Sequence, residues 1–348
     1  GGAFLLCYLL IVFLVGFPVM LAELSIGRAT QKNVVGAFRT LNSRWRFAGY
    51  IGIVILSYYC VVGGWVLKYV QIYAAGAHFG AGPGAYADYF STFSARPVEP
   101  LLWGLGFLVL CIVVVVRGVS QGIEKVSKVL MPLLFLLLAG LVVYSVTRPG
   151  AGEGLRFLFG IDPARLSGDT LVGALGQAFF SLSVGMGIMV TYGSYVPKSE
   201  NLAKSAGWIC ALDTLVAFLT EEFHLSRARA AIGLSAPMAL LSAGYSLSQS
   251  AGRGINLPWF DFKNGLQMLP MNAVMEKFTD NLMIPLGALC FCLFVGWVWG
   301  TKAAGQEIAG EHGLRRMQKP WAFAVRFLAP LVIVVILYFT LGMGEGLS

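Results

Sequence analysis

Long apolar stretches separated by short polar connections dominate the pattern of the chain. Most are long enough to cross a hydrocarbon core of about 30 Å as a helix, which takes about 20 residues. We place nine, at 4–22, 48–76, 98–116, 129–147, 171–195, 206–219, 228–248, 281–300 and 321–342. The alternating pattern of an outer-membrane barrel is absent from the sequence, so the backbone is expected to pair within helices. The pattern therefore predicts an all-α polytopic membrane protein.

Composition and charge agree with this fold class. The 348 residues are 57% hydrophobic and 12% charged, whereas soluble domains carry about 25% charged residues. The net charge of +8 could suggest nucleic acid, but its distribution follows the positive-inside rule. Five Lys or Arg lie in the connection 28–46 and one lies in 77–97. The first segment is therefore expected to run from outside to inside, and no nucleic-acid partner is expected.

The segment 206–219 is short and carries Asp213, which raises doubt that it is one complete span. Counting it as complete puts 13 Lys and Arg of the connections inside and 10 outside, whereas one additional crossing at this place changes the counts to 16 and 7. The second division follows the positive-inside rule better. We therefore expect a splice-like junction near 213–220, where parts of two helices are joined.

The reactive residues do not form a catalytic or metal-binding pattern. All six cysteines fall inside apolar stretches, and the three histidines lie at or beyond the ends of these stretches without acidic or cysteine neighbours. Neither the spacing of a zinc site nor a nucleophile with a base is visible in the sequence. We predict that the protein is not an enzyme and has no cofactor.

The stretch FFSLSVGMG at 179–187 interrupts a long apolar run with Ser181, Ser183, Gly185 and Gly187. One interpretation keeps the helix intact, with serines bonding to earlier carbonyls and glycines permitting close packing. The alternative is a helix that unwinds at the membrane midplane, where freed backbone groups face a ligand. The dipole of the second half-helix would then favour an anionic group. Two hydroxyls and two glycines at the centre of one span favour the alternative.

Four further residues stand out inside the apolar stretches. Glu23 lies near the inner end of the first segment, where it is either interfacial or an acceptor for a neighbouring broken helix. Asp213 is either half of a buried salt bridge or a cation ligand, and its central position favours the ligand. Ile55 and Tyr59 share one helix face. That spacing is more typical of core packing, although a buried phenol hydroxyl needs a partner.

Several motifs, in order along the chain, closely resemble the prokaryotic neurotransmitter:sodium symporter family. They are GGAFLLCYLL (1–10), GFPVMLAELSIGR (16–28), SYYCVVGGW (57–65), RGVSQGIEKVSKVLMP (117–132), GQAFFSLSVGMGIMVTYGSYV (176–196) and LSRARAA (225–231). The resemblance implies two inverted five-helix repeats, with helices 1 and 6 broken at a midplane site. It also implies a multi-pass protein of the inner (plasma) membrane that transports an amino acid with Na⁺ by alternating access.

The resemblance also implies roles for individual residues. Substrate-binding positions fall on Ile55, Tyr59, Phe180, Ser181, Ser183 and Met186, with Tyr59 on the substrate carboxylate and Phe180 as an aromatic lid. Na⁺ ligands fall on Ser181 and Asp213, and gating or supporting positions on Glu23, Tyr195, Glu221 and Asp280. Asp213 replaces the family's asparagine, which leaves proton coupling or an altered sodium affinity open.

Two departures from the family pattern predict a partial copy within one transmembrane domain, 1–348. The chain opens at the family's helix 2, and ALDTLVAF is followed directly by a segment that resembles the end of helix 8. Helix 1 and much of helices 7 and 8 are therefore expected to be missing, in agreement with the charge count. The parent function implied is symport of Na⁺ with a neutral, hydrophobic or aromatic amino acid. The alternatives are a membrane amino-acid sensor or scaffold that does not transport, and an ion channel.

Overall fold

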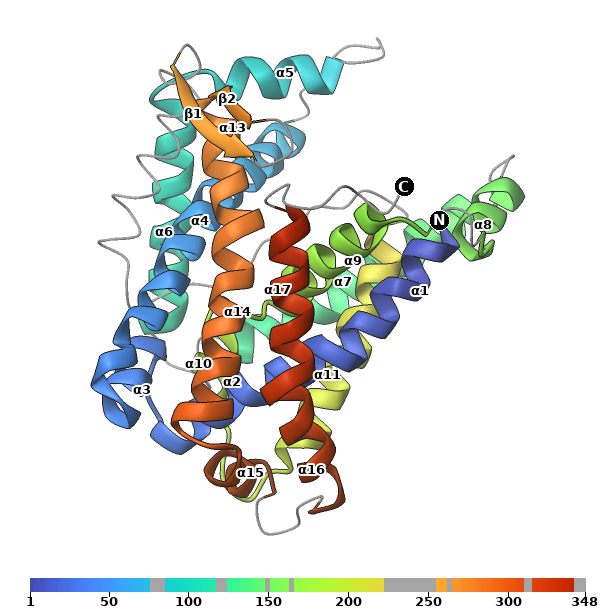
Figure 1. Ribbon diagram of the computed structural model, residues 1–348. Helices are drawn as coiled ribbons and strands as arrows, with labels where there is room; N and C mark the ends of the chain where they lie inside the picture. Colours follow the sequence, from blue (N-terminus) through green and yellow to red (C-terminus); the bar gives the residue numbers. More distant parts are fainter. Residues whose placement is uncertain are drawn as a thin grey trace.

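In the computed structural model, residues 1–75, 85–116, 124–147, 151–162, 166–221, 255–261, 265–309 and 315–340 are described. The first half contains α1 (Gly2–Ile11), η1 (Val12–Gly16), α2 (Phe17–Thr30), α3 (Val34–Leu41), η2 (Ser43–Trp45), α4 (Arg46–Ala74), α5 (Ala85–Ser94), α6 (Glu99–Val116), α7 (Lys125–Val146) and α8 (Ala151–Phe159). The second half contains α9 (Gly168–Leu182), α10 (Ile188–Gly193), α11 (Leu202–Glu221), β1 (Asn256–Asp261), β2 (Gly265–Pro270), α13 (Met271–Glu276), η6 (Lys277–Met283), α14 (Ile284–Leu293), η7 (Phe294–Val298), α15 (Thr301–Ala309), α16 (Arg315–Phe323), η8 (Ala324–Leu328) and α17 (Ala329–Thr340). Figure 1 shows these helices as a bundle.

Within the described residues, six helices are long and apolar enough to cross a membrane. They span Gly2–Thr30, Ser43–Ala74, Glu99–Val116, Lys125–Tyr144, Met271–Val298 and Gln318–Thr340. Each of the six contains most of one apolar segment that the sequence predicts. Single π-helical turns such as η1 and η7 lie inside three of these helices without ending them. The multi-pass helical fold is therefore confirmed.

The other three apolar segments have different outcomes. The segment 171–195 is divided between α9 and α10, and 206–219 lies inside α11, which continues without a break to Glu221. The segment 228–248 lies outside the described residues. The junction expected near 213–220 therefore stays a prediction.

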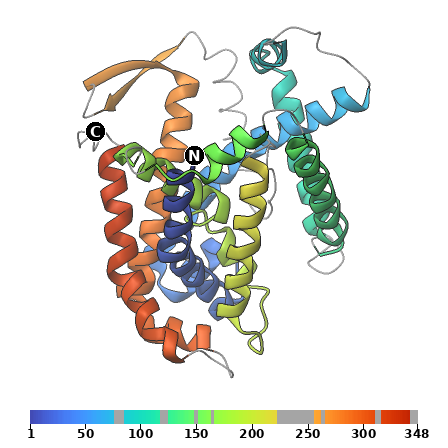
Figure 2. The ribbon, with the colours of Figure 1, turned by 90° about the vertical axis from the view of Figure 1, so that its right-hand side faces the viewer.

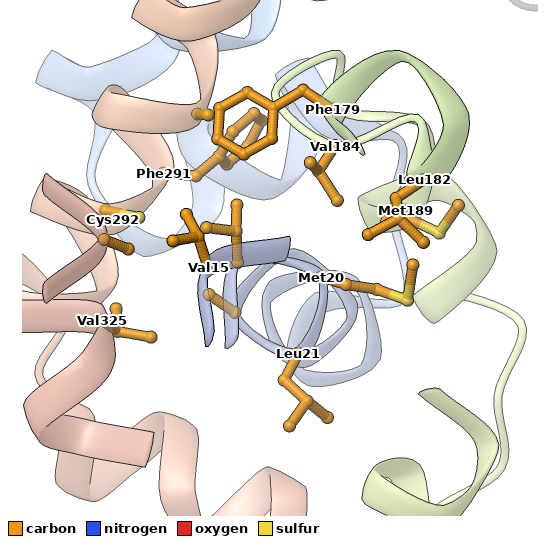
Figure 3. Close-up of a cluster of buried hydrophobic side chains, with 14 of the residues drawn as sticks. Val15, Met20, Leu21, Phe179, Leu182, Val184, Met189, Phe291, Cys292 and Val325 are labelled. Atoms are coloured by element: carbon orange, nitrogen blue, oxygen red, sulfur yellow. The ribbon is translucent and has the colours of Figure 1, made fainter. Parts of the chain in front are cut away.

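The helix α2 lies at the centre of the main hydrophobic core. Figure 3 shows Val15 of η1 and Met20 of α2 among side chains from other elements, while Leu21 points from another side of α2. These neighbours come from α9, the segment after it, α10, α14 and η8: Phe179, Leu182, Val184, Met189, Phe291, Cys292 and Val325. All seven are buried in the core. The core thus assembles around α2, beside the interruption between α9 and α10.

The helices α6 and α7 occupy the periphery. Figure 2 shows them to one side of the bundle, and α6 packs against α4. Their outward side chains are largely exposed, as expected for helices that face lipid.

A two-stranded antiparallel sheet, β1 with β2, is a feature that the sequence analysis missed. It precedes the Met271–Val298 helix and lies at one end of the bundle (Figure 1). The sequence does contain a hairpin signal, because Asn264-Gly265 separates two short runs with apolar and aromatic residues. Runs this short are well below the length of a membrane-spanning helix, so they do not stand out in the apolar pattern.

Candidate functional site

The chain unwinds between α9 and α10. The helix α9 ends at Leu182, α10 begins at Ile188, and Ser183 between them has φ 53°. Gly185 and Gly187 also have positive φ, 83° and 72°. Left-handed backbone is uncommon for a residue other than glycine, and it ends a helix. The interruption therefore lies within the FFSLSVGMG stretch, where the sequence analysis favoured one.

Glu23 supports this unwound segment from α2. Its carboxyl group is fully buried, and Oε1 accepts a hydrogen bond of 2.6 Å from the backbone N–H of Gly185. A buried N–H that has left its helix needs such an acceptor. Of the two interpretations of Glu23, the geometry matches the acceptor for a broken helix and not the interfacial carboxylate.

Two glycines of neighbouring helices approach the same segment closely. A Cβ added to Gly52 of α4 would collide with the carbonyl oxygen of Met186, and one added to Gly287 of α14 would collide with that of Gly185. The absence of side chains at these positions lets α4 and α14 pack directly against the unwound backbone. Three helices, α2, α4 and α14, thus fix its conformation.

Ser181 and Asp213, the two positions predicted to bind an ion, are in contact. The Ser181 hydroxyl in the last turn of α9 donates a hydrogen bond of 2.5 Å to Oδ2 of Asp213 in α11. Both side chains are half-buried. Hydroxyl and carboxylate oxygens are hard ligands of the kind that alkali and alkaline-earth cations prefer. These two oxygen donors therefore fit a pair of Na⁺ ligands. Among the residues that the structure describes, no group of three His, Cys, Asp or Glu could hold another metal ion.

Tyr59 of α4 packs against Phe180, the residue before Ser181. Their ring centroids are 5.7 Å apart, and Phe180 is partly exposed. The hydroxyl of Tyr59 is buried and has no hydrogen-bond partner among the residues that the structure describes. A buried phenol without a partner costs free energy unless a ligand or water completes it. The Tyr59 hydroxyl can therefore donate a hydrogen bond to an acceptor atom of a ligand.

The other residues predicted to bind substrate differ in how exposed their side chains are. Ile55, one turn before Tyr59 in α4, and Met186 in the unwound segment are both buried in the core. Ser183 is half-buried at the first unwound position. The structure thus places Ser183 and Met186 on the unwound segment itself, and Ile55 on the face of α4 that carries Tyr59.

The three predicted gate residues differ in their positions relative to this cluster. Tyr195 is 46% exposed in the turn after α10, and Asp280 is exposed in η6, which contacts α4. Glu221 is the last residue of α11, and its side chain lies outside the described part of the chain. Asp280 nevertheless lies close enough to Tyr59 to interact with it electrostatically. The gating roles of all three residues stay predictions.

A buried arginine near the interruption was missed, because the sequence analysis assigned Arg28 to a connecting loop. It lies in the last turn of α2, almost fully buried. Nη1 donates to the carbonyl of Glu200 at 2.8 Å, and Nε lies 3.6 Å from Oε2 of Glu307 in α15. Lys198 Nζ lies 3.5 Å from the other oxygen of Glu307. This cluster ties the turn after α10 to α2 and α15.

The fold and the site together define a polytopic helical protein with an interrupted helix. Its polar centre combines the paired oxygens of Ser181 and Asp213 with the buried phenol of Tyr59. Comparisons with known proteins identify the family. A model of the Sodium:neurotransmitter symporter family matches residues 1–75 and 100–275. The chain therefore belongs to this family, which confirms the resemblance seen in the sequence motifs. The family's proteins are transporters, so the prediction that the chain is not an enzyme is also confirmed.

Bacterial and archaeal relatives are named as uncharacterized sodium-dependent transporters. The chain is 40% identical to YhdH of Bacillus subtilis over 225 residues, 63% of this chain and 50% of the relative. It is 31% identical to one from Methanocaldococcus jannaschii over 362 aligned positions, 99% of this chain and 69% of the relative. A Haemophilus influenzae relative is 33% identical, with 63% and 51% covered. The chain thus spans about half the length of the two bacterial relatives.

Among solved structures, the chain is similar to the crystal structure of MhsT in complex with L-phenylalanine. The TM-score is 0.78 at 31% sequence identity, and the match covers 98% of this chain and 92% of that chain. The similarity confirms the symporter fold over nearly all of the chain.

Proposed function

We propose that this chain carries the amino-acid and sodium site of a symporter that moves a neutral, hydrophobic or aromatic amino acid with Na⁺ into the cell across the inner (plasma) membrane. One observation carries the proposal: the Ser181–Asp213 contact and the unpartnered Tyr59 hydroxyl both lie beside a helix interruption. The family membership and the similarity to MhsT with bound L-phenylalanine support it.

In the proposed site, Tyr59 donates its hydroxyl proton to the substrate carboxylate. Phe180 covers the substrate, while Ile55, Ser183 and Met186 line the pocket. The flexible Met186 side chain permits apolar substrates of several shapes.

Ser181 and Asp213 supply two of the Na⁺ ligands in this proposal. The ion would replace the hydroxyl proton as the partner of the carboxylate, so the Ser181 hydroxyl turns its oxygen toward the ion. Glu23 keeps the interrupted backbone in position and does not contact the ion. Tyr195 and Glu221 act at the inner gate and Asp280 at the outer gate.

The test is equilibrium binding of L-phenylalanine to the purified chain in Na⁺ and in K⁺. We expect Na⁺-stimulated binding that weakens at least tenfold in Ser181→Ala and in Asp213→Ala. Tyr59→Phe should weaken binding in both salts, because it removes a contact to the substrate and not to the ion. Ser91→Ala, which removes an exposed hydroxyl of α5, is the control and should bind like the unchanged chain. Unaltered Na⁺ dependence in both ion-site variants would refute the assignment.

The alternative function, a membrane amino-acid sensor or scaffold, predicts binding at the same site without transport. Uptake into proteoliposomes separates the possibilities. Saturable uptake that requires a Na⁺ gradient supports the symporter, and binding without uptake supports the sensor. Ohmic conductance without saturation would identify a channel instead.

A further inference from the structure

The hairpin of β1 and β2 has an apolar face that the helices leave uncovered. The strand register pairs Pro258 with Met268 and Phe260 with Leu266. Because side chains alternate between the two faces of a strand, these four lie on the same face. Phe260 is 54% exposed, Leu266 68% and Met268 59%. A hairpin at a water-facing surface normally shows polar side chains on its open face.

The opposite face of the hairpin is better covered. The residues that alternate with the exposed ones are half-buried. They are Leu257, Trp259, Gln267 and Leu269. Both strands contact α13, which directly follows β2. The exposed face also carries the amide of Asn256 at the base of β1, whereas Gln267 lies on the half-buried face. The hairpin is patterned with its apolar side outward.

The helix that follows places the hairpin at a definite depth. The backbone N–H of Met271 donates a 3.0 Å hydrogen bond to the carbonyl of Ile255, which ties the base of the hairpin to the helix start. Met271–Val298 has 28 residues, or about 42 Å at 1.5 Å per residue. A bilayer is about 30 Å thick in its hydrocarbon core and about 40–45 Å with its headgroups. One end of this helix therefore reaches each headgroup layer.

Charge decides which layer holds the hairpin. The connection after this helix, 302–319, carries Lys302, Arg315, Arg316 and Lys319. The positive-inside rule puts this connection in the cytoplasm, so the hairpin lies at the outer surface.

The exposed face also continues a surface that faces lipid. Figure 2 shows the hairpin projecting sideways from the top of the bundle, beyond the start of α13 and near the end of α17. The outer end of α17 exposes Val335 and Tyr338. An aromatic residue with apolar neighbours at a span end is typical of the membrane interface.

We propose that the hairpin is a membrane-surface anchor, which inserts Pro258, Phe260, Leu266 and Met268 into the outer headgroup layer. Its ligand is the lipid surface itself. Insertion removes this patch from water, as expected for a contiguous exposed apolar surface at that depth. The anchor holds the outer end of the Met271–Val298 helix relative to the bilayer. It does not depend on transport.

The test uses nitroxide labels on Met268→Cys and, as the matched control on the opposite face, Gln267→Cys in proteoliposomes. Oxygen concentrates in lipid and a nickel chelate stays in water, so the ratio of their collision rates reports immersion. We expect this ratio to be at least threefold higher at 268 than at 267. Leu266→Cys should behave like Met268→Cys. The unsubstituted chain, whose cysteines all lie in the apolar segments, supplies the background signal.

The second part of the test places a charged side chain on one face of the hairpin or on the other. With the label at 268, Leu266→Glu should lower the ratio toward the value in water, and Gln267→Glu should leave it unchanged. Equal, water-like ratios at 266, 267 and 268 would overturn the proposal. Spin–spin broadening at 268 that disappears on dilution with unlabelled chain would also overturn it, because a second copy would then cover the face.

Discussion

The helix Gly2–Thr30 and the helix Lys125–Tyr144 are almost equally apolar, yet they occupy opposite environments. Their most apolar windows have mean hydropathies of 2.7 and 2.4, but 50% of the first window is buried inside the protein and only 6% of the second. Lipid is as apolar as a protein core, so hydropathy places a helix in the membrane without choosing between the two. Other features must select the neighbours of each helix.

Close backbone approach and paired polar groups distinguish the buried helix. A Cβ on Gly27 of α2 would collide with the carbonyl of Val190 in α10, and one on Gly193 would collide with that of Leu24. Glu23 bonds across the same interface to Gly185. In contrast, no atom of another helix lies within 4 Å of where a Cβ on Gly140 of α7 would be. Small residues and polar partners therefore decide which apolar helix becomes the core.

The largest expected difference concerns packing. Phe291 of α14 is fully buried and lies 5.4 Å from Phe38, measured between ring centroids. Phe291→Ala should lower the free energy of unfolding by about 3–5 kcal/mol, because it leaves a cavity in a close-packed core. Leu136→Ala on α7, where the side chain is 72% exposed, should change it by less than about 0.5 kcal/mol. Denaturant unfolding in detergent measures both, and equal losses would contradict the division into core and periphery.

The next effect concerns the polar contact at the interruption. Glu23→Ala leaves the buried N–H of Gly185 without its acceptor, at a cost of about 2–3 kcal/mol. Glu23→Gln keeps an acceptor oxygen and should recover part of that loss. Glu124 pairs with Lys128 on the exposed face at the start of α7, so Glu124→Ala should cost only about 0.3–0.5 kcal/mol. A Glu23→Ala variant as stable as Glu124→Ala would show that the contact does not hold the unwound segment.

The smallest expected changes in the free energy of unfolding have opposite signs in the two regions. Gly287→Ala forces a methyl group against the carbonyl of Gly185 and should destabilise the fold by about 1–2 kcal/mol. Gly140→Ala meets open space and should stabilise α7 by about 0.5–1 kcal/mol through its better helix propensity. Thermal unfolding of the two variants side by side tests this. A stabilised Gly287→Ala variant would mean that α14 and the unwound segment are not in close contact.

Much of the fold was predictable because its signals are local. A run of about 20 apolar residues needs no knowledge of its neighbours to be assigned as a span, and six such helices are present in the described residues. The FFSLSVGMG stretch was recognisable for the same reason, since serine and glycine disturb a helix wherever it packs. The hairpin was not predicted, because its strands have only six residues each and so short a strand has a weak hydrophobic pattern.

What the sequence alone determined differs from what only the tertiary structure decided in one respect. The second group consists of contacts between residues that are distant in the sequence. The sequence determined the membrane environment, the helical class, the family and the place of the interruption, because each follows from composition or a contiguous motif. The tertiary structure decided that Glu23 reaches Gly185, that Ser181 meets Asp213, and that Arg28 is buried against Glu307. Residues so far apart in sequence come into contact only when their helices pack together. Because these helices have similar hydropathy, hydropathy does not predict which of them pack against each other.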